Sequence, residues 1–81
     1  MYAKKKLTDQ QDRILEYLIN HDHITSATSI TSLGIMDLRK RVSELRRMGY
    51  SIEDRMVTKE NRYGKKVSYK EYFLGKGEKN D

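Results

Sequence analysis

The sequence predicts a small α+β domain in which three helices precede a C-terminal β-hairpin of two or three strands. In the first half of the chain, apolar residues recur at spacings of three and four, as they do on one face of a helix. After Gly49, two runs rich in β-branched and aromatic residues flank a polar segment that contains a glycine, which is typical of a hairpin.

Length and composition favour one compact domain. The chain has 81 residues, a net charge of +5 and no cysteine, so neither disulfides nor thiolate metal sites can stabilise it. No apolar run approaches the roughly 20 residues that span a membrane, and no signal-peptide pattern is present. We therefore expect a cytoplasmic single domain over residues 1–81, with an ordered core over about 7–74, a basic arm over 1–6 and a frayed tail over 75–81.

The first helix is predicted over residues 9–21. Thr8 and Gln11 have the spacing of a capping box, in which each side chain binds a free amide at the start of the helix. Asn20-His21-Asp22 ends the apolar pattern. The buried face is expected to hold four aliphatic residues: Ile14, Leu15, Leu18 and Ile19.

The second helix is predicted to be short, because serine and threonine are poor helix formers. A β-favouring piece at residues 23–25 precedes it and is expected to form at most a one-bridge strand. Ser26 is the expected cap, and Gly34 should end the helix by adopting a left-handed conformation. The residues expected to face inward are Ala27, Ile30 and Leu33.

The third helix is predicted over residues 36–48, after a buried anchor at Ile35 and before a stop at Gly49. Its inward stripe should consist of Leu38, Val42 and Leu45. The opposite side should carry Met36, Arg39, Lys40, Ser43 and Arg47.

The hairpin is predicted from strands at residues 50–58 and 67–74, joined by a polar loop at 59–66. Gly64 can supply a positive φ in that loop. Because apolar and polar residues alternate imperfectly in both strands, we expect a β-bulge.

Positive charge is concentrated in two segments. Residues 35–50 contain five bases against two acids, and residues 59–70 contain five bases against one acid. Such segregation suits a polyanionic partner.

Three ordered groups of residues carry a resemblance to a known family. The first is Leu7-Thr8, Gln11, Ile14-Leu15 and Leu18; the second is Leu33-Gly34-Ile35, Leu38, Arg41-Val42-Ser43, Leu45-Arg46 and Gly49-Tyr50; the third is Ile52 with Tyr72 and Leu74. Together they span residues 7–74 and resemble the winged helix-turn-helix family that is common among bacteriophage and mobile-element regulators. The resemblance implies a winged helix-turn-helix fold and double-stranded DNA as the partner.

A helix fits the major groove of DNA, so the polar side of helix 36–48 is the expected reading surface. Arg39 is the expected base reader, because arginine can donate two hydrogen bonds to guanine. The other residues expected on this surface are Lys40, Ser43, Arg47 and Met36, with Thr28, Thr31 and Ser32 of the second helix on backbone phosphates. The resemblance places loop 59–66, the wing, beside the minor groove or flanking phosphates, with contacts from Arg62, Lys65 and Lys66.

These features predict sequence-specific binding of double-stranded DNA by a small transcriptional regulator or an excision-type accessory factor, and not an enzyme. A homodimer or cooperative oligomer on DNA is expected, because one small module reads few base pairs. The alternative is a winged-helix protein-interaction module, for example a phage-encoded inhibitor of a host protein. No cofactor, small-molecule substrate or membrane is expected as a partner.

The histidines and three acidic residues of the hairpin are expected to have structural roles. His21 and His23 have only Asp22 close by in sequence, so a metal site is not expected. The acidic residues Glu53, Asp54 and Glu71 lie among lysines and arginines, which favours cross-strand salt bridges over catalysis. Arg41 is expected to pair with Glu44 or another acid.

Overall fold

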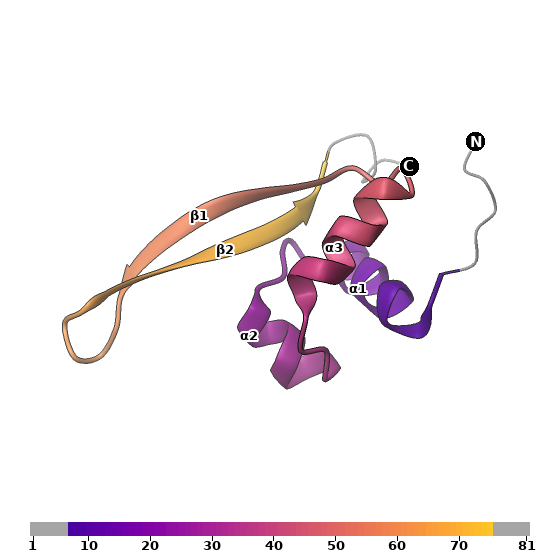
Figure 1. Ribbon diagram of the computed structural model, residues 1–81. Coiled ribbons are helices and arrows are strands. Elements are labelled where there is room, and N and C mark those ends of the chain that lie inside the picture. Colours follow the sequence, from indigo (N-terminus) through magenta and orange to yellow (C-terminus); the bar gives the residue numbers. More distant parts are fainter. Residues whose placement is uncertain (1–6, 76–81) are drawn as a thin grey trace.

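The computed structural model describes residues 7–75, in which three helical segments pack at the base of a long β-hairpin (Figure 1). The elements are α1 (Asp9–Asn20), α2 (Ser26–Thr28) continuing into the π-helical turn η1 (Ser29–Leu33), α3 (Leu38–Arg47), β1 (Ile52–Glu60) and β2 (Lys66–Leu74). This order confirms the predicted α+β fold. The predicted arm at 1–6, and residues 76–81 of the predicted tail, lie outside the described residues. Gly75, the first residue of the predicted frayed tail, is instead buried, and its amide donates to the Ser51 carbonyl at 2.8 Å.

Helix α1 begins with the predicted capping box. The Thr8 side chain accepts a hydrogen bond from the Gln11 amide at 3.2 Å, and the Gln11 side chain accepts one from the Thr8 amide at 3.1 Å. Ile14, Leu15 and Leu18 are buried as expected. The prediction for Ile19 is wrong, because its side chain is 68% exposed. The buried face of α1 consists of Gln11, Ile14, Leu15 and Leu18, and Ile19 lies just outside it.

The second helix differs most from its prediction. Its N-cap is Thr25 rather than Ser26, and the Thr25 side chain accepts a hydrogen bond from the Thr28 amide at 3.2 Å. The π-helical turn then changes the spacing of the inward residues. Ser29 is fully buried, whereas Ala27 is exposed and Ile30 is 43% exposed, so both apolar residues were wrongly placed inside. Leu33 packs against the core as predicted.

Gly34 ends this segment with a φ of 70°, the left-handed conformation that the sequence predicts. Helix α3 then begins at Leu38, two residues later than predicted, because Asp37 is its N-cap and accepts a hydrogen bond from the Lys40 amide. Met36 therefore lies in a bend before the helix. The three predicted inward residues, Leu38, Val42 and Leu45, are all buried.

The hairpin pairs without interruption from Ile52↔Leu74 to Glu60↔Lys66, so the predicted bulge is absent from the paired residues. Strand β1 begins and ends two residues later than predicted and β2 begins one residue earlier, which shortens the loop from 59–66 to 61–65. Gly64 has a φ of 79°, as its position in the loop suggested. An isolated bridge between Ile24 and Tyr72 confirms the one-bridge strand.

One hydrophobic cluster joins the helices to the base of the hairpin. Ile52, Tyr72 and Leu74 of the strands pack in the same core as the buried aliphatic residues of α1 and α3. Further along the hairpin most residues are exposed, and the strands extend well beyond the helices (Figure 1). None of the helices in residues 7–75 combines the length and hydropathy needed to cross a membrane.

Candidate nucleic-acid interface

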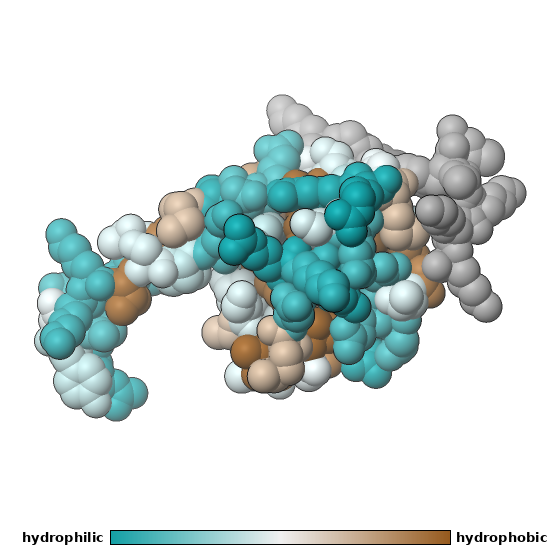
Figure 2. All heavy atoms as spheres, viewed as in Figure 1, coloured by the Kyte–Doolittle hydropathy of each residue, from teal (hydrophilic) through white to brown (hydrophobic). Residues whose placement is uncertain are grey.

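The exposed side of α3 carries four of the predicted DNA-binding residues. Leu38, Val42 and Leu45 hold the opposite side of the helix in the core. Viewed as in Figure 1, hydrophilic residues cover the visible side of α3 (Figure 2). The fold thus brings together, on an accessible helix surface, Arg39, Lys40, Ser43 and Arg47.

Four other arginines of the described chain form ion pairs. The pairs are Arg13 with Asp9 (2.9 Å), Arg41 with Glu44 (3.1 Å), Arg46 with Asp54 (2.8 Å) and Arg55 with Glu71 (2.9 Å). The Arg41 pair is the one that the sequence predicts. By contrast, within residues 7–75 the side chains of Arg39, Lys40 and Arg47 form no ion pair, so their charge remains available to a ligand.

Arg46 has a structural role that its sequence position does not reveal. Its Nε donates a hydrogen bond to the Ile52 carbonyl at 2.8 Å, and its Nη2 donates one to Asp54 Oδ2 at 2.8 Å. This second hydrogen bond lowers the pKa of the Asp54 carboxyl below its ordinary value of 3.8. Arg46 therefore fixes the end of α3 to the start of β1.

The tip of the hairpin forms a second group of unpaired bases. The Asn61 side chain accepts hydrogen bonds from the Tyr63 and Lys65 amides, at 2.9 and 3.1 Å, which orders the turn. Among the described residues no acid pairs with the exposed bases at this tip, which are Lys59, Arg62, Lys65 and Lys66. Lys59 belongs to this group, although it was not among the predicted DNA contacts.

A sequence model described as a winged helix-turn-helix domain matches residues 9–77. This chain belongs to the winged helix-turn-helix family. No curated protein sequence matches it. Winged helix-turn-helix domains typically bind DNA and are not enzymes. In this chain the helix-turn-helix consists of η1, the Gly34 turn and α3, and the hairpin β1–β2 that follows is the wing.

In this winged helix-turn-helix domain, the remaining predicted contacts lie on or just after the second helix. Thr31 and Ser32 are exposed, but the Thr31 hydroxyl donates to the Ala27 carbonyl at 3.0 Å. Thr28 is half-buried, and its hydroxyl oxygen accepts a hydrogen bond from Thr25 at 3.1 Å. Met36 is 76% exposed, next to the start of α3 but outside it.

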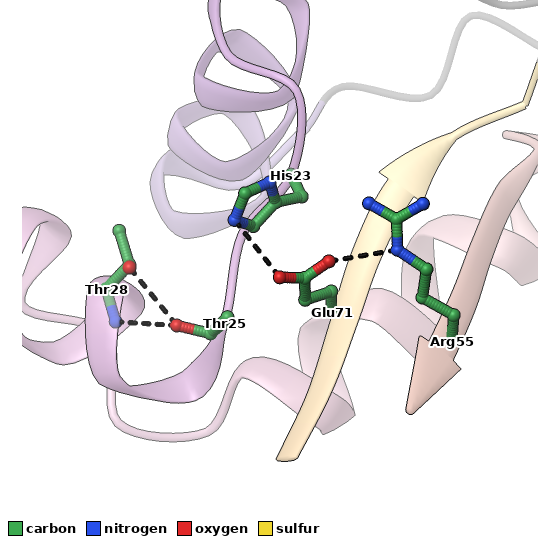
Figure 3. A network of polar contacts seen from close by, with 5 residues as sticks. All are labelled: His23, Thr25, Thr28, Arg55 and Glu71. Atoms are coloured by element: carbon green, nitrogen blue, oxygen red, sulfur yellow. Dashed lines mark hydrogen bonds and ion pairs between the residues drawn. The ribbon is translucent and has the colours of Figure 1, made fainter. Parts of the chain in front are cut away.

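The histidines and carboxylates of the winged helix take part in local contacts. His21 stacks on Tyr17, with ring centroids 4.0 Å apart. His23 lies 3.4 Å from one carboxylate oxygen of Glu71, and Arg55 binds the other at 2.9 Å (Figure 3). Within residues 7–75, no three such side chains come together as a metal site would require. The predicted cross-strand salt bridge is present for Glu71, which pairs with Arg55. Asp54 pairs with Arg46 of α3 rather than across the hairpin, and Glu53 forms no salt bridge within residues 7–75.

Proposed function

We propose that this winged helix-turn-helix protein binds double-stranded DNA sequence-specifically, as a small transcriptional regulator or an excision-type accessory factor. In this proposal α3 enters the major groove and the wing tip lies beside the neighbouring minor groove and its phosphates. Assembly on DNA as a homodimer or cooperative oligomer would extend the recognised sequence.

One observation carries the proposal: the distribution of unpaired basic side chains. Within residues 7–75, four arginines form ion pairs, whereas the bases without an acid, except Lys70, lie on the exposed side of α3 or at the wing tip. Unpaired bases repel one another, so grouping them costs stability unless a polyanion neutralises them. DNA, with phosphates along both groove edges, supplies such a partner.

The residues have distinct expected roles. Arg39 reads a base edge, since it is near the start of α3 and a guanidinium can donate two hydrogen bonds to guanine. Lys40 and Arg47 lie on the same side of α3, about two turns apart, and contact phosphates there, with Ser43 between them on that surface. The wing bases Arg62, Lys65 and Lys66 contact the flanking backbone.

The first prediction concerns Arg39. A preferred duplex is selected from a random library, and its dissociation constant is measured by fluorescence anisotropy at several salt concentrations. Arg39→Ala should lose about 1–3 kcal/mol of discrimination between the preferred and a scrambled duplex. Lys40→Met and Arg47→Met should weaken binding to both duplexes alike, and each should lower the salt slope by about 1.

Arg13→Ala is the matched control. Arg13 is also an exposed arginine, but it lies on α1, where it pairs with Asp9 and donates a hydrogen bond to the Leu33 carbonyl at 3.1 Å. The Arg13→Ala variant should bind both duplexes like the wild type. Circular dichroism checks that all variants are folded. Unchanged discrimination in Arg39→Ala would contradict the role given to α3. Failure of the wild type to bind any duplex, with capture of a protein partner instead, would favour the protein-interaction module.

A further inference from the structure

A hollow of about 450 Å³ lies between the start of α2 and the middle of β2. His23 and residues 25–28 line one side of it, and Tyr69 and Lys70 line the other. Its lining thus comes from the helix-turn-helix on one side and from the wing on the other. In Figure 1, α2 lies beneath β2.

The backbone explains why these residues meet. Ile24 and Tyr72 exchange two hydrogen bonds of 2.9 Å, which pairs the segment before α2 with the edge of β2. In antiparallel pairing this bridge sets Ser26 opposite Lys70. At Ser26 the chain turns into α2 instead of continuing along the edge, so the space beside Lys70 remains open.

Several hydrogen-bond donors border this space without an acceptor. Within the described residues the Lys70 ammonium forms no ion pair and the Ser26 hydroxyl forms no hydrogen bond. The Thr28 hydroxyl accepts from Thr25, so its own hydrogen is free to donate elsewhere (Figure 3). One cation and two hydroxyls around a small open space suit an anion with several oxygens, such as a phosphate group.

The carboxylate beside the hollow does not oppose an anion. Glu71 is only 8% exposed, and Arg55 donates a hydrogen bond to its Oε1 at 2.9 Å. The His23 imidazole covers the other oxygen, Oε2, at 3.4 Å (Figure 3). The negative charge of Glu71 is therefore neutralised within the protein, which leaves Lys70 as the charge that borders the hollow.

Asp54, the other acid whose charge interacts with Lys70, is also occupied. The hydrogen bond from Arg46 is the main cause of the lowered pKa of the Asp54 carboxyl, and the nearby positive charge of Lys70 contributes less. Asp54 Oδ2 lies 2.8 Å from Arg46, whereas it forms no ion pair with Lys70 within the described residues. The Lys70 ammonium can therefore bind an incoming anion without breaking a salt bridge.

We propose that this hollow binds one phosphate of the DNA strand that runs between the major groove under α3 and the minor groove under the wing. The inference rests on the proposed function and adds a site to it. Lys70 pairs with the phosphate, and Ser26 and Thr28 donate hydrogen bonds. Because these residues come from α2 and the wing, the bound phosphate fixes both elements on the same backbone and sets the register of the protein on the duplex.

The test replaces single phosphates of the selected duplex by neutral methylphosphonates and measures the dissociation constant at each position. At one position, the replacement should weaken wild-type binding about tenfold, the effect expected for one charge-assisted hydrogen bond. Lys70→Met should itself bind about tenfold more weakly, have a salt slope lower by about 0.9, and show no further weakening at that position. Lys70→Arg should retain the penalty, and Ser26→Ala should reduce it.

Lys59→Met is the control, because it removes a lysine from the opposite face of the wing and should keep the full penalty at the same position. Wild-type affinity and salt slope in Lys70→Met, alongside the expected loss of discrimination in Arg39→Ala, would overturn this inference and leave the proposed function intact. A wild-type protein that binds no duplex would overturn both. The methylphosphonate measurement on the wild type needs no variant to fold.

Discussion

Ser29 is the single residue on which the turn between the second and third helices depends most directly. Its side chain is fully buried, and its hydroxyl donates a hydrogen bond of 2.7 Å to the carbonyl of Ile35. The Ile35 amide in turn donates to the Ser29 carbonyl at 3.0 Å. A buried carbonyl needs a donor, and within the helix-turn-helix the serine supplies it.

Ser29→Ala should therefore destabilise the protein more than its small loss of volume suggests. The substitution leaves the Ile35 carbonyl without its side-chain donor, which costs about 1–3 kcal/mol in the free energy of unfolding. For a domain of this size each kcal/mol lowers the melting temperature by about 4–8 °C, which circular dichroism would detect. Ser32→Ala, at an exposed position of the same segment, should stay within about 0.5 kcal/mol of the wild type. Equal melting temperatures for the two variants would contradict the argument.

Ser29 also shows where prediction from the sequence ends. The capping box of Thr8 and Gln11 could be predicted, because both partners lie within one helical turn. The burial of Ser29 in place of Ile30 could not, because it depends on a π-helical turn and on a carbonyl six residues away. The unpaired state of Lys70 likewise depends on which acids the wing brings near it. Local spacing identified the basic surface of α3, whereas tertiary contacts decide which other bases remain free.

At the scale of elements, the helix-turn-helix is defined by the short connection between η1 and α3. Gly34 closes η1 in the left-handed region, and its amide donates to the Ile30 carbonyl at 3.1 Å. Asp37 then starts α3, two residues later than predicted. The predicted start at Met36 was too early because the N-cap is Asp37, and aspartate is among the residues that cap a helix best.

Gly34→Ala should cost about 1–2 kcal/mol, the penalty of a side chain in the left-handed region. No atom lies within 4 Å of the added Cβ, so the expected cost is that of the backbone conformation alone. Gly34→Asn should cost less, because asparagine tolerates this conformation better. Urea denaturation of the two variants measures the difference. The same stability for alanine as for glycine would show that the turn relaxes to a different conformation.

At the scale of the whole molecule, the wing consists of a base that packs in the core and an outer half that does not. Its base belongs to the core through Ile52, Tyr72 and Leu74, and Arg46 ties it to α3. Its outer half contributes none of the buried core residues. The predicted loop was too long because Lys59 and Lys66 were taken as loop residues. Both are exposed strand residues. Strand pairing requires only backbone hydrogen bonds, so a lysine side chain does not indicate whether its residue is in a strand.

This division predicts that the wing can be shortened with little effect on stability. Replacing residues 58–68 by Asn-Gly joins the paired residues Val57 and Tyr69 through a favoured two-residue turn and preserves the ion pairs of Asp54 and Glu71. The free energy of unfolding should change by less than about 1 kcal/mol, because no core residue is removed. Affinity for the selected duplex should fall, and the salt slope should decrease by about 0.9 for each phosphate that the protein no longer neutralises.

A full-length wing in which the four tip bases are glutamine should show the same weakening, which would assign the effect to charge rather than to length. A shortened protein with unchanged affinity and an unchanged nuclease footprint would show that the wing tip does not lie against the DNA.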